Sequence, residues 1–288
     1  MKKASLTAKT VLTALTALTA LVLAISLTGS GCGSDKPAGA KAAETGGVKP
    51  KARVFRADDF NGKTFAILTG SSFDAAARKV VGAAQLRYYN TITEAMGAVL
   101  SGDVDATLAE EPVARKFAAQ NPQLAVLYPP VEIENYAYIF PKRDGGKLRD
   151  EFNVFMVRTR LGGTYEDMVR RWIDSPQPPP MPEIPLNTES PDKKLIFATT
   201  DSDEPFSFRT SEGKLEGFDI ELALRFARDR GYGAVEFQIL DFPDIIPAAR
   251  DGKADFASNL ITVTEERKAL VDFSEPYYYG GTVAVVKN

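Results

Sequence analysis

The chain has 288 residues, a formal net charge of −3 and 44% hydrophobic residues, a composition typical of a soluble globular protein with one large or two ordinary domains. It contains no histidine, which excludes Ser-His-Asp triads, histidine general bases and histidine-ligated metals. Its single cysteine, Cys32, excludes an intrachain disulfide and a Cys₄ zinc site, and we expect no cofactor.

Residues 1–32 have the pattern of a targeting segment. The positive start "MKK" precedes an uncharged apolar run at residues 11–28, and small residues lead to Cys32. This predicts a lipoprotein-type signal peptide, with Cys32 as the lipidated first residue of the mature chain. Gly29 stands where a lipobox prefers a Leu-like residue, and the run is near membrane-spanning length, so an uncleaved anchor or a soluble secreted protein stays open.

Residues 33–52 are rich in Gly, Ala, Lys and Pro and predict a flexible tether. Removal of residues 1–31 takes away Lys2, Lys3 and Lys9 and leaves 32 positive and 38 negative side chains, a net charge of −6. Because no basic face stands out, nucleic acid is not an expected partner.

A first folded body is expected at residues 53–173, where strand and helix patterns alternate. The predicted strands are residues 63–68, 85–89, 104–109 and 134–140, and the predicted helices are residues 72–82, 91–102, 111–120, 147–163 and 164–173. Gly82 closes the first of these helices, and Pro112 lies near the first turn of the third.

A proline-dense segment, residues 174–192, predicts a semi-rigid linker because proline at that density cannot continue a helix or a sheet. The second body, residues 193–288, alternates again. Its predicted strands are residues 194–200, 234–240, 254–259 and 282–287, and its predicted helices are residues 218–231 and 243–252. This alternation predicts an α/β architecture with a largely parallel sheet.

Candidate ligand-binding residues follow strands of the first body. Ligands of open α/β sheets bind at the carboxyl ends of the strands, where helix N-termini point N–H groups. Ser71 and Ser72 follow the strand at 63–68, and Glu110 or Glu111 ends the strand at 104–109. The serines could instead be helix caps, and the glutamates could simply favour a helix N-terminus.

The second body contributes a candidate cation, whereas the candidate carboxylates lie in the first body. Asn259 and Thr262 follow a strand, Thr262 and Glu265 have capping-box spacing, and Arg267 lies one turn into a short helix, where it could also be a solvated cation. A cation that can bind a carboxylate, a carboxylate that can hold an ammonium, and hydroxyls around both predict a zwitterion site between two bodies.

Several motifs resemble one known family. "GFDIEL" (217–222), "TVTEER" (262–267) and "DFSEPYY" (272–278) resemble the first lobe of the family 3 extracellular solute-binding proteins, the amino-acid receptors of ABC importers. "NGKTFAILTGSSFD" (61–74), "EEPVA" (110–114) and "GGTYEDMVRRW" (162–172) resemble their second lobe. The resemblance implies a type II periplasmic binding protein fold, with two α/β lobes around a cleft.

The order of the lobes is reversed relative to that family, which has the first lobe at its N-terminus. We therefore expect a circular permutation, with the old termini joined by residues 174–192 and the first hinge connection cut between Asn288 and about Ala52. This implies that only one continuous hinge strand remains. A truncated gene, or lobe pairing between two chains, stays open.

The resemblance also implies roles for the candidate residues. Arg267 matches the arginine that binds the ligand α-carboxylate, and Thr262 and Asn259 match its polar neighbours. Ser71 and Ser72 match the hydroxyls of the second lobe.

Three further positions concern the rest of the ligand. Glu110 stands where the family usually has an aspartate for the α-ammonium, and Phe242 matches an apolar wall. The family often has an aromatic residue where this chain has Asp203, with Glu204 beside it, so extra acid near the pocket could favour a basic ligand unless both residues face solvent.

These features predict binding without chemistry: a lipid-anchored, extracytoplasmic receptor for a polar amino acid that docks on an ABC permease. A sensory or degenerate lipoprotein not tied to transport is the first alternative. An enzyme, such as a dehydratase on the same fold, is the second, with Glu110 and Asp203 as an acid-base pair.

Overall fold

The computed structural model describes residues 53–81, 85–177 and 180–288, all of which belong to one compact unit. The predictions for the signal peptide, Cys32 and the tether lie outside the described residues. Among the described helices, none has both the length and the apolar character needed to cross a membrane.

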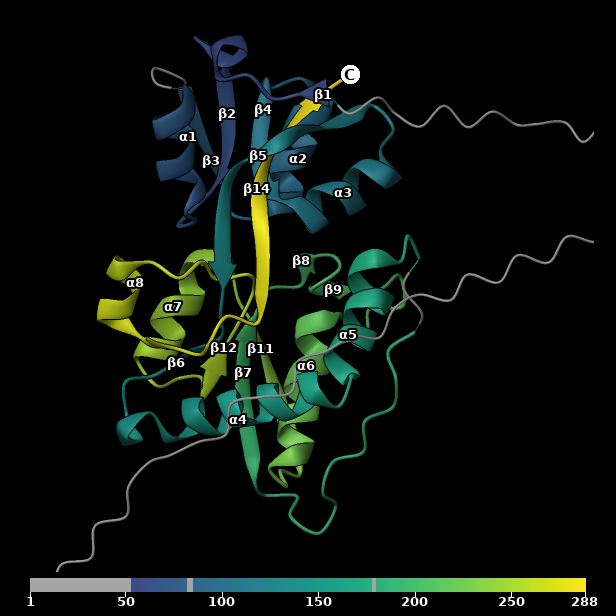
Figure 1. The fold of residues 1–288 in the computed structure, drawn as a ribbon, viewed down its shortest axis with the longest axis vertical. Helices are drawn as coiled ribbons and strands as arrows, with labels where there is room; N and C mark the ends of the chain where they lie inside the picture. The colour runs from purple at the N-terminus through teal and green to yellow at the C-terminus, as the bar shows by residue number, and fades with distance from the viewer. Residues whose placement is uncertain (1–52, 82–84, 178–179) are drawn as a thin grey trace, which may run out of the picture. The chain divides into compact units, whose positions relative to one another are not determined.

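One sheet has six strands in the order β1-β5-β14-β4-β2-β3 (Figure 1). Its strands are β1 (Arg53–Val54), β2 (Thr64–Leu68), β3 (Gln85–Tyr89), β4 (Ala106–Glu110), β5 (Leu124–Tyr136) and β14 (Tyr278–Lys287). β14 runs antiparallel to both of its neighbours, and the other pairings are parallel. Helices η1 (Ala57–Phe60), α1 (Phe73–Val81), α2 (Ile92–Ser101) and α3 (Glu111–Gln120) accompany this sheet. We call residues 53–136 and 278–288 the six-stranded lobe.

A second sheet has five strands in the order β11-β7-β12-β6-β13. They are β6 (Ile139–Phe140), β7 (Lys194–Thr199), β11 (Ala234–Ile239), β12 (Phe256–Ala257) and β13 (Asp272–Phe273). A small antiparallel sheet accompanies it, made of β8 (Ser202–Asp203), β9 (Ser207–Arg209) and β10 (Leu215–Glu216). The helices are η2 (Asp144–Gly146), α4 (Lys147–Leu161), α5 (Thr164–Met168), the π-helix η3 (Val169–Asp174), α6 (Phe218–Asp229), α7 (Phe242–Arg250) and α8 (Glu265–Leu270). We call residues 137–277 the five-stranded lobe.

Local sequence explains several of these elements. Thr91 and Glu94 form a capping box at the start of α2, and Gly102 ends that helix with a left-handed φ of 89°. β2 is almost wholly buried, which fits the continuous apolar run of a parallel strand covered on both faces. The α/β class with two lobes, expected from the alternation of strands and helices, is confirmed.

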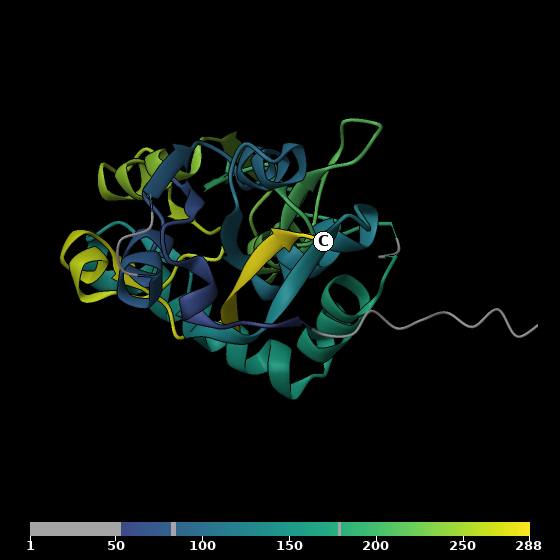
Figure 2. The same cartoon turned by 90° about the horizontal axis from the view of Figure 1, so that it is seen from above.

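The chain passes between the two lobes twice. β5 ends at Tyr136, directly before the five-stranded lobe, and β14 begins at Tyr278, directly after it. The two strands pair antiparallel, beginning with Tyr278 opposite Tyr136, and run side by side in both views (Figures 1 and 2). The expectation that only one hinge strand remains is therefore wrong, because β14 continues unbroken through the crossing.

The sheets do not follow the division that the proline-dense segment suggests. β6, which precedes that segment, pairs with β12 and β13, and α4 packs against α6. β14, which follows it, lies between β4 and β5. Residues 137–174 therefore belong with the five-stranded lobe and residues 278–288 with the six-stranded lobe, because strand pairing joins segments that are distant in sequence.

Candidate functional site

Two hydroxyls from different lobes meet beyond the carboxyl end of β2. Ser72 Oγ lies 3.1 Å from Thr262 Oγ1 and donates to Glu134 Oε1 at 2.7 Å. Ser71, in contrast, donates to the Leu68 carbonyl and accepts the N–H of Phe73, so its hydroxyl is used locally at the start of α1. Of the two predicted serines, only Ser72 reaches the other lobe through its side chain.

Arg267 links the same two lobes through its guanidinium. Its Nη1 donates to the Thr262 carbonyl at 3.0 Å and its Nη2 donates to the Gly70 carbonyl at 2.9 Å. The side chain is buried, and its guanidinium carbon lies 5.9 Å from the centroid of the Phe242 ring, within cation-π range. Burial lowers the pKa of Arg267, and the nearby Glu134 opposes that shift. Arg267 is thus a buried cation between the lobes and not a solvated one.

The capping role expected of Thr262 is wrong. Helix α8 begins at Glu265, and its N-cap is Thr264, whose side chain accepts the N–H of Arg267. The spacing of Thr262 and Glu265 matched a capping box, but the helix starts two residues later than that match requires. The Thr262 hydroxyl is therefore available to the other lobe.

Glu110, and not Glu111, faces this site. It ends β4 and stands at the N-cap position of α3, yet its side chain makes no capping hydrogen bond and is only 6% exposed. Burial, followed by the neighbouring charge of Asp203, raises the pKa of Glu110 well above its usual value. Glu111 is directed elsewhere, where it accepts the Tyr128 hydroxyl and pairs with Arg115.

Asp203 is also buried, so the alternative that it faces solvent is wrong. It accepts hydrogen bonds from Thr200 and Ser202, and Asn259 also bonds to it. Burial raises the pKa of Asp203, and these hydrogen bonds oppose the shift. Asn259 is 2% exposed, and its Oδ1 has no hydrogen-bond partner in the part of the chain that the structure describes.

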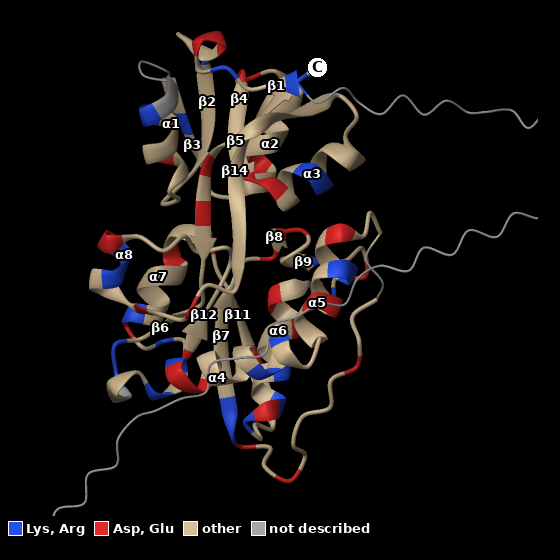
Figure 3. Ribbon diagram, in the orientation of Figure 1, with Lys and Arg blue, Asp and Glu red and all other residues tan. Residues whose placement is uncertain are grey.

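Glu134 is the site residue that the sequence did not reveal. It lies on β5 and is 6% exposed. Its Oε1 accepts the Ser72 hydroxyl, while its Oε2 accepts the hydroxyls of Tyr136, at 3.1 Å, and of Thr282. Figure 3 marks acidic positions on β5 and in the segment of β8, the elements that carry Glu134 and Asp203. The signal that could have identified Glu134 is an alternating pattern along its strand. Because the predicted strand began at residue 134, that pattern was not available.

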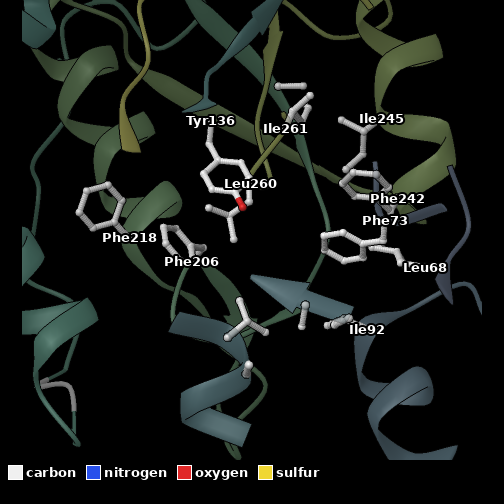
Figure 4. Close-up of a cluster of buried hydrophobic side chains, with 14 of the residues drawn as sticks. Leu68, Phe73, Ile92, Tyr136, Phe206, Phe218, Phe242, Ile245, Leu260 and Ile261 are labelled. Carbon is white, nitrogen blue, oxygen red and sulfur yellow. The ribbon is translucent and has the colours of Figure 1, made fainter. Parts of the chain in front are cut away.

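Apolar side chains from both lobes form a buried cluster that includes Phe242, the neighbour of Arg267. Figure 4 shows a buried cluster in which Phe73 and Ile92 belong to the six-stranded lobe, and Phe206, Phe242 and Leu260 to the five-stranded lobe. Phe242, predicted as an apolar wall, is 6% exposed. Leu260 has a left-handed φ of 52°, an unusual conformation for a leucine, directly after Asn259.

A cavity of about 470 Å³ lies beside the sequence neighbours of Asp203, and its lining includes two cations, Lys116 and Arg209. Ser202 and Glu204, the residues on either side of Asp203, line it together with Phe208. Thr93 and Gln120 line it from the six-stranded lobe and also bond across it, to the Ser202 carbonyl at 3.1 Å and to Glu204 at 2.9 Å. Its volume lies within the range of about 300–1,000 Å³ that is usual for small-molecule sites.

The arrangement combines one guanidinium, three carboxylates and several hydroxyls, which suits the binding of a small charged molecule. No group of three or more acidic or cysteine side chains among the described residues has the arrangement of a metal site. The site therefore offers ion pairing and hydrogen bonding to an organic ligand.

Comparison with known proteins gives similarity over one part of the chain. The family model of the bacterial extracellular solute-binding proteins, family 3, matches residues 195–288. An arginine-binding extracellular protein of Bacillus subtilis is 38% identical over 100 residues, which are 35% of this chain and 38% of that protein. A glutamine-binding protein of an ABC transporter from the same organism is 33% identical over 97 residues, 33% of this chain and 36% of that protein.

One solved structure among those that match is an ancestral cyclohexadienyl dehydratase. It is 37% identical, with a TM-score of 0.29, and the match covers 30% of this chain and 36% of that chain. In all of these comparisons the chain spans less than two fifths of the length of the protein it matches.

The matched region holds β7, α6, α7, α8 and β14, and with them Asp203, Asn259, Thr262 and Arg267. The family resemblance read from the motifs is confirmed for this region. Residues 195–288 are therefore similar to the family 3 bacterial extracellular solute-binding proteins.

Proposed function

We propose that the chain is an extracytoplasmic binding protein that captures a polar amino acid, or a similar small zwitterion, between its two lobes and delivers it to an ABC importer. The observation that carries the proposal is the set of contacts that joins Arg267 and Thr262 of one lobe to Gly70 and Ser72 of the other. A ligand carboxylate placed there can take hydrogen bonds from the guanidinium and from the Thr262 hydroxyl, and Glu110 can hold an ammonium.

Ligand binding is then coupled to the relative position of the lobes. β5 and β14 are the two connections, and the groups that bind the ligand lie on both sides of them. A ligand that contacts both lobes binds the closed arrangement more tightly than the open one. The difference between these two affinities sets how far binding shifts the protein towards the closed arrangement. The two relatives described above bind different amino acids, so they support an amino-acid ligand without selecting one.

The test is a thermal-shift screen of the chain from residue 33 against the common amino acids, followed by calorimetric titration of any that raise the melting temperature. A ligand of the folded state must raise it. We expect Arg267→Ala to abolish the shift, and Lys268→Ala, which changes an exposed cation next along the same helix, to retain it. If a cooperatively folding protein gives no shift with any amino acid, the proposal is refuted.

The proposed membrane anchor is a lipid on Cys32. Its support is the targeting pattern of residues 1–32 and the match to a family of extracellular proteins. Expression with a labelled fatty acid tests it: the label should enter the wild-type chain and be absent from Cys32→Ser. An unlabelled wild-type chain would contradict the anchor and leave the binding function untouched.

The circular permutation also remains a proposal. Its support is the interleaving of the two halves, since β14 lies between β4 and β5 and Arg53 Nη1 reaches the Lys287 carbonyl at 3.5 Å. A reordered chain, with residues 193–288 joined through a short Gly-Ser linker to residues 53–173, should fold and rank ligands as the natural order does. Failure of the reordered chain to fold would contradict the permutation.

A further inference from the structure

The buried groups of the site carry an excess of negative charge. Glu110, Glu134 and Asp203 are each at most 6% exposed, and Arg267, at 7%, is the cation beside them. Electrostatic coupling joins Glu110 to all three of the others. With every group ionised, three carboxylates and one guanidinium sum to −2. Among the described residues the other buried cation is Lys116, which donates to the carbonyls of residues 175 and 176 and so does not balance this charge.

The site is also short of hydrogen-bond donors. Three nearby hydroxyls already donate hydrogen bonds to carboxylates of the protein: Ser72 donates to Glu134, and Thr200 and Ser202 donate to Asp203. Asn259 reaches the same cluster through its bond to Asp203, and its Oδ1 remains an acceptor without a partner among the described residues. A buried acceptor without a donor is unfavourable, so a ligand rich in N–H groups would complete the site.

A metal ion is not the ligand that these carboxylates and the Asn259 oxygen favour. The carboxylates are not arranged as a metal site within the described residues, whereas an ammonium or guanidinium can spread its N–H groups over separate acceptors.

We propose that the ligand is an amino acid with a cationic side chain, bound by its α-carboxylate to Arg267 and by its two positive groups to the carboxylates of Glu110, Glu134 and Asp203. The inference rests on the proposed function and narrows its ligand class. With all four groups ionised, a neutral zwitterion leaves the charge of the site at −2, whereas a cationic amino acid reduces it to −1. Glu134 is then a specificity-determining residue.

The matched pair of arginine and citrulline tests the proposal, because the two are nearly isosteric and differ in the charge of the side chain. Calorimetric titration of the chain from residue 33 should give at least about tenfold tighter binding of arginine. Putrescine, which has two cationic groups and no carboxylate, should bind more weakly than arginine because it offers Arg267 no carboxylate to pair with.

The variant Glu134→Gln keeps the shape of the side chain and removes its charge. It should reduce the ratio of arginine to citrulline affinity by about tenfold. The matched control is Glu132→Gln, two residues earlier on β5, whose carboxylate pairs with Lys79 at 3.2 Å and is 38% exposed. The control should leave the ratio within about twofold. Melting curves of both variants establish that they are folded at the titration temperature.

The outcomes separate this inference from the function on which it rests. Equal or tighter binding of citrulline, or an unchanged ratio in Glu134→Gln, overturns the cationic ligand and leaves an amino-acid receptor in place. Putrescine binding in preference to arginine overturns the bound carboxylate. If no amino acid binds a folded protein, the proposed function fails and this inference fails with it.

Discussion

Asp219 should make the stability of the protein depend on pH in a direction opposite to that of most aspartates. It lies on α6 and is fully buried; its Oδ2 accepts the hydroxyls of Ser258 at 2.9 Å and Tyr277 at 3.1 Å. Its Oδ1 has no partner among the described residues. Burial raises the pKa of Asp219 to about 7. The hydrogen bonds from Ser258 and Tyr277 favour the ionised form and partly oppose this rise.

The sign follows from proton linkage. Between the unfolded pKa, about 3.9, and the folded pKa the native state binds more protons than the unfolded state, so the free energy of unfolding falls as pH rises. A shift of about three pKa units corresponds to about 4 kcal/mol lost over this window, and the loss levels off above the folded pKa.

The variant Asp219→Asn removes the titration while keeping the size of the side chain. Urea denaturation followed by circular dichroism, at several pH values, gives the free energy of unfolding of both proteins. From about pH 5 to about pH 7, the wild type should lose about 2 kcal/mol relative to the variant. Glu236→Gln, at an exposed position on β11, serves as the control and should show no such trend. A difference between wild type and Asp219→Asn that is flat with pH would refute the reasoning.

Three further substitutions test the packing and capping of the five-stranded lobe. Glu221→Gln should cost about 3 kcal/mol of stability in urea denaturation, because the fully buried carboxylate pairs with both Arg171 and Arg225; a loss below about 1 kcal/mol would contradict this. Thr264→Ala removes the cap of α8 and should lower stability by about 1 kcal/mol; an unchanged urea midpoint would show that the cap is not needed. Gly217→Ala should cost more than about 2 kcal/mol, since φ is 133° and the new Cβ would lie 2.2 Å from a backbone carbonyl oxygen; a melting temperature equal to that of the wild type would contradict the clash.

Local sequence predicted most of the regular elements. The strand at 85–89 and the helix at 111–120 have the predicted bounds, and the helix predicted at 218–231 spans Phe218–Asp229. These elements depend on apolar periodicity, capping residues and glycine or proline punctuation, which are all local features. The residues that resemble family motifs include Glu110, Thr262 and Arg267, and the structure brings all three into one site.

The longest strand was mostly missed. β5 runs from Leu124 to Tyr136, and its first ten residues mix polar and apolar positions around Pro129 and Pro130. Such a pattern is typical of a loop, because proline and charged residues are unfavourable in a strand. Pairing with β14 makes this segment a strand nevertheless, and it places Glu134 beside Ser72.

The sequence by itself determined the α/β class, the alternation of elements, the excess of acidic residues and the presence of a family 3 segment. Only the tertiary structure decided which sheet each strand joins, that Glu110 and not Glu111 faces the site, and that Glu134 belongs to it. The physical reason is that strand pairing and burial depend on residues far apart in the chain, such as Tyr136 opposite Tyr278, whereas periodicity and capping depend on near neighbours.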